Sequence, residues 1–205
     1  MKKISLKIIG ILCIVFYIFT SCFMLSGCDF FEMLDFSEEI DNNIENYLSK
    51  RESVKFAEKF LPTLEDVGGE RISYSYQKTD MAIFITETIA LFAEYSPDSY
   101  ASSKAQMLSS YEILQEPHIS SDGDYLTPPK TFLYKGYRFF TCINTTDSYY
   151  ESNSILFIGY NDKTCRLAYC YFWDSDRDIM FSKDEYPDDA MTEIMDLYFD
   201  WNEME

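Results

Sequence analysis

Histidine and glycine are scarce in this chain, and their scarcity excludes several classes of enzyme. Among 205 residues there are seven glycines and a single histidine, His118. A zinc protease helix needs two histidines, so that class is excluded. The glycines are too widely spaced to form a dinucleotide fingerprint, a phosphate loop or a G-x-S-x-G nucleophile elbow. Because no catalytic motif is present, we expect a protein that is not an enzyme.

Basic residues are also in short supply. The chain has 17 Lys+Arg against 35 Asp+Glu, so its formal net charge is −18. A nucleic-acid binder needs a surplus of cations to replace phosphate counterions, so nucleic acid is excluded as a partner. Anionic lipid repels an acidic surface, which argues against a peripheral membrane module. At 47% hydrophobic and 18% aromatic residues, the chain is apolar enough to fold.

Cysteines are few in the second half of the chain. The three found there are Cys142, Cys165 and Cys170, and their odd number excludes a fully paired disulfide framework. Cys165 and Cys170 are five residues apart, so on one strand they face opposite sides and cannot pair with each other. One bridge from Cys142 to either of them stays open. The alternative is a set of free, mostly buried thiols.

Two catalytic alternatives remain beside the non-enzymatic interpretation. One of the three thiols could pair with His118 as nucleophile and base, although nothing in the sequence brings them together. The many carboxylates could supply a glycosidase pair, which needs a cleft between them. A small hydrolase is therefore the least favoured class.

The first 27 residues have the layout of a secretory signal peptide. Three lysines at positions 2, 3 and 7 form a positive start, and residues 8–25 are almost entirely apolar. Such a segment directs the export of the protein and is not part of the folded domain. We therefore divide the chain into a signal peptide (1–27), a short tether (28–36) and one folded domain (37–205).

The end of the apolar run resembles the lipobox of a bacterial lipoprotein precursor. It reads Leu25-Ser26-Gly27-Cys28, and the lipobox consists of Leu, a small residue, Gly or Ala, and Cys. The resemblance implies that Cys28 is lipidated and that the mature chain starts there. Residues 1–27 contain three cations and no acids, so the mature chain carries 14 − 35 = −21. Two acyl chains would attach such a protein stably to a membrane.

Two other outcomes for this segment stay open. Phe19-Thr20-Ser21-Cys22 is a second lipobox candidate, although Phe fits badly where Leu is preferred. The run at 8–25 could also remain as an uncleaved membrane anchor, since eighteen residues just span a bilayer. Both outcomes place the remainder outside the cytoplasm, because the positive end stays inside.

Beyond the tether, hydrophobic spacing predicts helices and strands in alternation. The first half has a helix over 37–61, starting at Ser37 and ended by Pro62, and a strand over 72–77. Residues 82–95 form one long strand or two paired strands with a turn near Glu87. Ser96 then caps a helix over 97–110.

Residues 115–130 form a loop, and the second half is rich in strands. We expect strands over 132–143, 155–160 and 167–173, with a hairpin turn at Asn161-Asp162-Lys163. Residues 165, 167, 169, 171 and 173 share one face of the last strand, and 166, 168, 170 and 172 the other. A final helix follows Pro187, with an apolar stripe at positions 191, 194, 195, 198 and 201. The order α-β-β-α-β-β-β-α predicts an α+β fold with an antiparallel sheet of about five strands.

Three blocks of the domain resemble small lipoproteins of Gram-positive clostridia. The blocks are Phe60-Leu61-Pro62-Thr63-Leu64-Glu65-Asp66, Gly159-Tyr160-Asn161-Asp162-Lys163 and Leu167-Ala168-Tyr169-Cys170-Tyr171-Phe172. The resemblance implies location and fold only, since no activity comes with it.

A calcium site is the most specific local pattern. Asp174, Asp176 and Asp178 alternate after the last strand, as ligands 1, 3 and 5 of a calcium loop do, and Glu185 falls at position 12. Two features argue against a calcium loop of the EF-hand type. Position 6 is Ile179, where the turn needs Gly, and a strand precedes the loop where an EF-hand has a helix. A solvated acidic turn is the alternative, and we expect no other cofactor.

Aromatic residues are abundant, with 17 Tyr, 17 Phe and 2 Trp. Tyrosines on an open sheet face can bind sugar rings or proteins, because they combine a flat apolar ring with a polar tip. The residues that would do so are Tyr74, Tyr76, Tyr169, Tyr171 and Trp173. The alternative is that they fill the core, and a covered face would weaken the binding interpretation.

Together these observations predict a monomeric lipoprotein attached through Cys28 to the outer face of the cell membrane. Its domain would bind an extracellular protein or glycan without catalysis. A second hypothesis is an inhibitor or immunity-type lipoprotein, whose negative charge would speed association with a basic extracellular protein.

Overall fold

The computed structural model describes residues 36–81, 84–116, 127–143, 153–175 and 188–201. The chain divides into two units, Met1–Phe36 and Ser37–Glu205. Except for Phe36, the first unit lies outside the described residues, and with it the signal segment, the tether and Cys28. The fold described below is that of the second unit.

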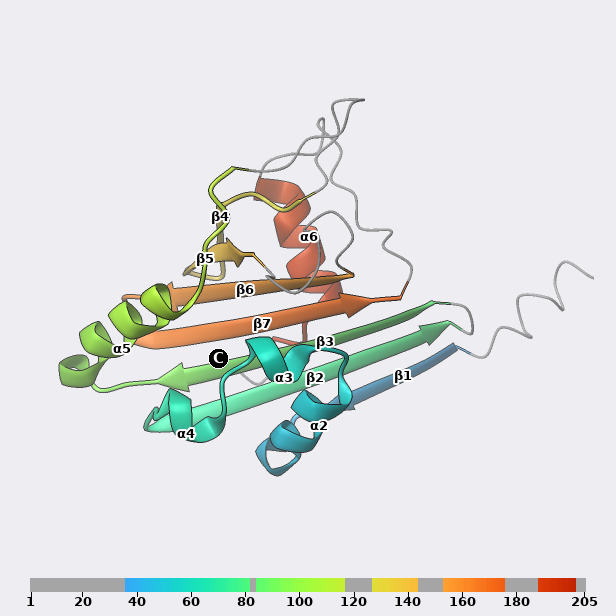
Figure 1. Ribbon diagram of the computed structural model, residues 1–205, viewed down its shortest axis with the longest axis horizontal. Helices are drawn as coiled ribbons and strands as arrows, with labels where there is room; N and C mark the ends of the chain where they lie inside the picture. The colour runs from blue at the N-terminus through green and yellow to red at the C-terminus, as the bar shows by residue number, and fades with distance from the viewer. Residues whose placement is uncertain (1–35, 82–83, 117–126, 144–152, 176–187, 202–205) are drawn as a thin grey trace, which may run out of the picture. The chain divides into compact units, whose positions relative to one another are not determined.

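One antiparallel sheet of seven strands forms the centre of this unit, in the order β1-β2-β3-β7-β6-β5-β4 (Figure 1). The strands are β1 (Phe36–Asp41), β2 (Arg71–Met81), β3 (Ile85–Glu94), β4 (Thr131–Tyr134), β5 (Tyr137–Cys142), β6 (Ser154–Asn161) and β7 (Arg166–Asp174). The predicted α+β class is confirmed. The predicted count of five strands and the order of elements are wrong.

Helices cover both faces of the sheet. They are the 3-10 helix η1 (Ile44–Asn46), α2 (Tyr47–Ser53), α3 (Ala57–Phe60), α4 (Leu64–Val67), α5 (Pro97–Ser110) and α6 (Asp188–Tyr198). Residues of α2–α5 pack with one face of the sheet in a first core, and α6 packs against the opposite face in a second core.

The central strand β7 confirms the predicted alternation of its side chains. Leu167, Tyr169 and Tyr171 belong to the first core. Ala168, Cys170 and Phe172 belong to the second. Because successive side chains of a strand point to opposite faces, β7 has to be apolar on both sides to serve two cores.

The helix predicted to start at Ser37 is wrong at its beginning. Residues 36–41 form the edge strand β1, where residues 37–40 are exposed. Gln77 of β2 donates to the Glu38 carboxylate at 3.1 Å, and Lys50 of α2 forms an ion pair with Glu39. The acidic residues that resembled a first helical turn instead contact α2, 11 residues further on, and β2, 39 residues further on.

The rest of that predicted helix is broken into short pieces. Val54 is extended where α2 ends, and Phe56 has a left-handed φ of 66° where α3 starts. Three helical pieces therefore stand where the spacing predicted one helix.

The single strand predicted over 132–143 is also wrong, since this stretch forms the hairpin of β4 and β5. Lys135 and Gly136 have φ values of 45° and 81°, and positive φ at both central residues defines a type I′ turn. β1 and this split raise the strand count from five to seven.

The stretch 82–95 contributes one strand, and no turn lies near Glu87. In β3, Glu87 pairs with Lys78 on one side and Trp173 on the other, and it accepts a hydrogen bond from Tyr76 at 2.9 Å. β2 ends at Met81 and β3 begins at Ile85.

Several local predictions are confirmed. Helix α5 begins after Ser96, whose hydroxyl accepts from the backbone N–H of Ser99, and ends at Ser110. The β6–β7 hairpin turns where Asn161 Oδ1 accepts from the N–H of Lys163 at 3.0 Å. In α6, Met191 and Met195 are buried, as the apolar stripe predicted.

Within the described ranges, no helix is both long and apolar enough to cross a membrane. The apolar run at 8–25 lies outside those ranges.

Gly159 provides a test of how tightly the second core is packed. A Cβ at this position of β6 would lie 2.5 Å from ring carbons of Phe139 on β5. We therefore expect Gly159→Ala to lower the free energy of unfolding in urea by about 1–3 kcal/mol through overpacking. Combined with Phe139→Leu, its cost should be smaller than the sum of the two single costs. Additive costs would contradict this packing.

Candidate functional site

The segment between residues 54 and 68, here the 54–68 segment, lies over the first core and has little regular structure. Its helices α3 and α4 have only four residues each. Thr63 and Asp66 form a capping box at the start of α4, and Gly68 ends it with a left-handed φ of 63°. Helices this short are not stable alone, because nucleation costs more than a few hydrogen bonds return. Contacts from elsewhere must hold the segment in place.

Tyrosine hydroxyls supply those contacts by donating to main-chain carbonyls of the segment. The bonds are Tyr47 to Pro62 at 2.6 Å, Tyr95 to Val67 at 2.6 Å, Tyr111 to Phe60 at 2.9 Å and Tyr171 to Lys55 at 2.8 Å. The donors come from α2, the end of β3, the end of α5 and from β7. The carbonyls of Phe60 and Val67 are at the ends of α3 and α4, where short helices leave them unpaired, and those of Lys55 and Pro62 lie between helices.

Arg51 of α2 adds two further bonds to the same segment. Its Nε donates to the Leu61 carbonyl at 2.8 Å, and its guanidinium also donates to the Glu58 carbonyl. The charge of Arg51 also contributes to lowering the pKa of Asp66. A half-buried cation thus lies beneath the segment, with its donors turned toward the main chain.

A cavity of about 370 Å³ lies between the 54–68 segment and α5. This volume falls in the range of about 300–1,000 Å³ that is typical of small-molecule sites. Three tyrosines line it together with polar residues of α5: Tyr95, Tyr111, Tyr169, Ser103, Gln106 and Ser110. All residues that line this cavity are among those the structure describes.

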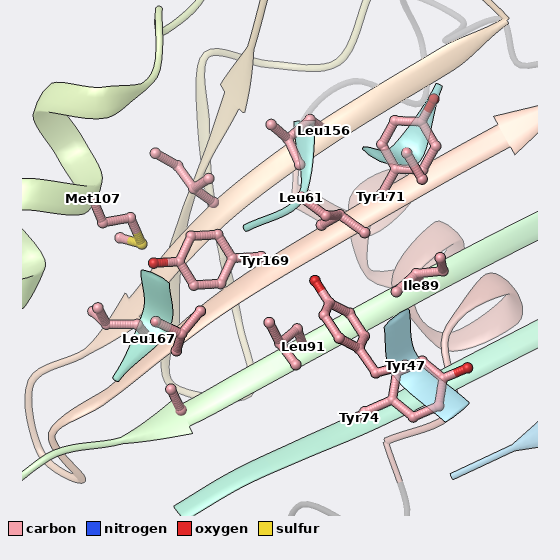
Figure 2. Packing of buried hydrophobic residues seen from close by; sticks show 14 of the residues in the cluster. Tyr47, Leu61, Tyr74, Ile89, Leu91, Met107, Leu156, Leu167, Tyr169 and Tyr171 are labelled. Atoms are coloured by element: carbon pink, nitrogen blue, oxygen red, sulfur yellow. The ribbon is translucent and has the colours of Figure 1, made fainter. Parts of the chain in front are cut away.

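Of the three tyrosines that line this cavity, Tyr169 is the one whose hydroxyl does not donate to a carbonyl of the 54–68 segment. It is 6% exposed, and its ring lies 6.1 Å from that of Tyr111, centroid to centroid. Figure 2 shows its hydroxyl directed toward Met107 of α5, which also lines the cavity. No hydrogen bond among the described residues involves this hydroxyl, whereas the hydroxyls of Tyr95 and Tyr111 both donate to carbonyls.

The Tyr169 hydroxyl is uncharged. A tyrosine is already a neutral phenol at physiological pH, and burial raises the pKa of Tyr169 further above the ordinary value. A phenol both donates and accepts a hydrogen bond. The Tyr169 hydroxyl is therefore available to a molecule in the cavity both as a donor and as an acceptor.

Charges around the cavity are balanced. Arg51 and Lys59 oppose Glu58 and Asp66 in its lining. The pKa of Asp66 is lowered, chiefly by hydrogen bonds from the Thr63 hydroxyl and N–H, so the carboxylate is ionised at neutral pH. The Nζ of Lys59 lies 4.7 Å from the centroid of the Phe56 ring. This balance differs from the strongly acidic composition of the chain as a whole.

The aromatic residues proposed from the sequence as an open binding face are covered instead. Tyr74, Tyr76, Tyr169 and Tyr171 are at most 6% exposed and lie in the first core. Trp173 is half-buried, with the Nζ of Lys55 5.7 Å from its ring centroid. The helical layer α2–α5 covers this face, as the core-filling alternative expected. Only Tyr169 of the set lines the cavity.

The predicted calcium ligands fall mostly outside the described residues, where Asp176, Asp178 and Glu185 lie. Asp174 is 6% exposed, and its carboxylate accepts from the Thr86 hydroxyl at 3.0 Å. No group of three or more metal-ligating side chains occurs in the part of the chain that the structure describes. The calcium loop stays a prediction.

The thiols Cys142, Cys165 and Cys170 are free. Burial raises the pKa of Cys142 to about 12 and that of Cys170 well above its usual value, so both are protonated thiols at neutral pH. A thiol in this state is a poor nucleophile. His118, its proposed partner in a small hydrolase, lies outside the described residues.

Sequence signals could have located the capping box of α4 but not the cavity. Thr63 followed three residues later by an acidic side chain is a recognisable helix start. Nothing in the pattern of β7 separates Tyr169 from Tyr171, because both point to the same face. Comparison with protein-family models, with curated proteins and with solved structures finds no match for this chain.

Tyrosine-to-phenylalanine substitutions should separate the tyrosines that hold the segment from the one that does not. Tyr47→Phe and Tyr111→Phe should each lower the free energy of unfolding by about 1–2 kcal/mol, since each leaves a main-chain carbonyl without its donor. Tyr169→Phe should leave the free energy of unfolding unchanged, because the hydroxyl forms no hydrogen bond that the substitution would remove. Denaturant titration measures all three, and equal losses would refute the distinction.

Acid should remove the contribution of the α4 capping box. Because the folded-state pKa of Asp66 is lowered, its carboxylate adds stability above its unfolded pKa of about 3.9, and this is lost as the pH falls through the lowered value. Asp66→Asn should therefore be less stable than wild type at pH 7, and the difference should shrink below about pH 4. Glu65→Gln is the matched control, because it removes the neighbouring carboxylate, which takes no part in the capping box. A constant Asp66→Asn difference down to pH 2 would contradict the assignment.

Proposed function

We propose that this protein is a lipid-anchored, non-catalytic binding protein of the outer face of the cell membrane, and that it acts as a monomer. Its domain takes its ligand in the cavity between the 54–68 segment and α5. The observation that carries the binding role is the unpartnered hydroxyl of Tyr169 in a charge-balanced cavity of about 370 Å³. The Tyr169 oxygen is not among the fully enclosed polar atoms that lack a partner in the described residues, so it opens onto the cavity, and a ligand there can form a hydrogen bond with it.

Membrane attachment is supported by the sequence that precedes the domain. A basic start, an apolar run and the Leu25-Ser26-Gly27-Cys28 box follow one another in the order that export and lipidation require. The tether 28–36 has nine residues and spans at most about 30 Å when extended. A domain held at that distance, with −21 on the mature chain, would be kept off anionic lipid by repulsion.

A non-catalytic role is supported by the state of the groups that could react. The buried thiols of Cys142 and Cys170 are protonated, and the Asp66 carboxylate is engaged in the capping box. The hydroxyl of Tyr169 is a neutral phenol, and burial raises its pKa further. These states suit binding better than nucleophilic or acid–base chemistry.

The charge of the mature chain favours a second candidate, an inhibitor or immunity-type lipoprotein that occludes a basic extracellular protein. A net charge of −21 would accelerate association with such a partner, and salt would screen the attraction. This partner would engage the acidic surface and would leave the cavity empty.

Intact-mass spectrometry of the protein from the membrane fraction of its native host tests the attachment. We expect the mass of Cys28–Glu205 plus a diacylglyceryl group, and Cys28→Ala should lose both the modification and the cleavage. Cys22→Ala is the matched control and should leave the mature mass unchanged. A full-length unmodified mass in all three proteins would show an uncleaved anchor and overturn the lipoprotein assignment.

A further inference from the structure

We infer that the cavity beside Tyr169 binds a short uncharged saccharide, of one or two sugar rings, and that the Tyr169 hydroxyl bonds directly to it. This inference rests on the proposed binding function and specifies its ligand. Three properties of the cavity support it: an unpartnered hydroxyl, a balanced charge and a mixed polar and aromatic lining.

The first property is the contrast between Tyr169 and its neighbours. Tyr171 lies two residues further along the same face of β7, and its hydroxyl donates to the Lys55 carbonyl at 2.8 Å. The hydroxyls of Tyr95 and Tyr111, in the same cavity, are also taken up by carbonyls of the 54–68 segment. Tyr169 is 6% exposed, as Tyr95 is, but its hydroxyl bonds to no such carbonyl and is left for a molecule that enters the cavity.

The balanced charge argues for an uncharged ligand. An anion would meet Glu58 and Asp66, on a chain whose overall charge already repels it. A cation would be attracted by those carboxylates and by the tyrosine rings, but it would lie close to the Arg51 guanidinium. A neutral ligand is repelled neither by the carboxylates nor by the guanidinium.

The mixed lining argues for a saccharide among neutral ligands. Sugars present several hydroxyls, each of which donates and accepts, together with flat C–H faces that pack on aromatic rings. The cavity offers matching groups: phenol and serine hydroxyls, the Gln106 amide, carboxylate acceptors and the tyrosine rings. Its volume suits a small molecule and excludes a folded protein partner.

Saturation-transfer NMR and calorimetry of the purified mature protein would test this with two probes, N,N′-diacetylchitobiose and maltose. We expect at least one of them to bind. Tyr169→Phe should weaken that binding about tenfold, the effect of losing one hydrogen bond without moving the ring. Tyr171→Phe is the matched control: it should reduce stability but bind as wild type does, since its hydroxyl faces the Lys55 carbonyl.

A second pair of variants on α5 guards against an indirect effect of Tyr169→Phe. Gln106→Ala should also weaken binding, because Gln106 lines the cavity and alanine preserves the helix. Ser109→Ala lies on the same helix outside the lining and should bind as wild type does. Circular dichroism establishes that each variant is folded.

Each alternative outcome has a definite meaning. If neither disaccharide binds, or if Tyr169→Phe and Gln106→Ala bind as wild type does, the saccharide inference is wrong. Choline, added as a cationic probe, would also overturn it if choline binds while the sugars do not, although a binding function at the cavity would then survive. Failure of the lipoprotein assignment would be detected separately, by the intact mass of the protein from the membrane fraction.

Discussion

The hydrogen bonds from tyrosine hydroxyls to the carbonyls of the 54–68 segment are the interaction on which the rest of this structure depends. The segment contains helices too short to persist alone, yet it must cover the apolar face of a seven-stranded sheet. Donors fixed on the sheet, on α2 and near the end of α5 satisfy its carbonyls and set its path. That path determines both the first core and one wall of the cavity.

This arrangement explains why tyrosine is so abundant in the chain. A tyrosine fills space in the core as phenylalanine does, and its hydroxyl reaches the main chain of the covering layer. Tyr47 and Tyr171 are fully buried and perform both tasks. Tyr169 performs only the first, and its proposed role in ligand binding rests on that difference.

The two cores also account for the distribution of charge. β6 and β7 are apolar on both faces over most of their length, and two carboxylates that the inner strands carry, Glu87 of β3 and Asp174 of β7, accept hydrogen bonds from Tyr76 and Thr86. In the cavity lining, by contrast, Arg51 and Lys59 offset the two carboxylates. The charge of the cavity lining therefore differs in balance from that of the chain as a whole.

Local signals determined much of the fold from the sequence alone. The two-faced pattern of β7, the Ser96 cap of α5, the turn at Asn161 and the apolar stripe of α6 each depend on neighbouring residues. The α+β class follows from them, because alternating strands and amphipathic helices must cover one another. The proposed lipid anchor likewise comes from the sequence alone.

Only the tertiary structure decided the features that depend on distant partners. Ser37-Glu38-Glu39 has the local pattern of a helix start, but pairing with β2 makes it an edge strand. Tyr169 and Tyr171 are equivalent in the sequence pattern, and they differ because a carbonyl of the 54–68 segment lies within reach of one hydroxyl and not of the other. The reason is physical: periodicity specifies which face a side chain occupies, whereas its hydrogen-bond partner depends on which residues pack above that face.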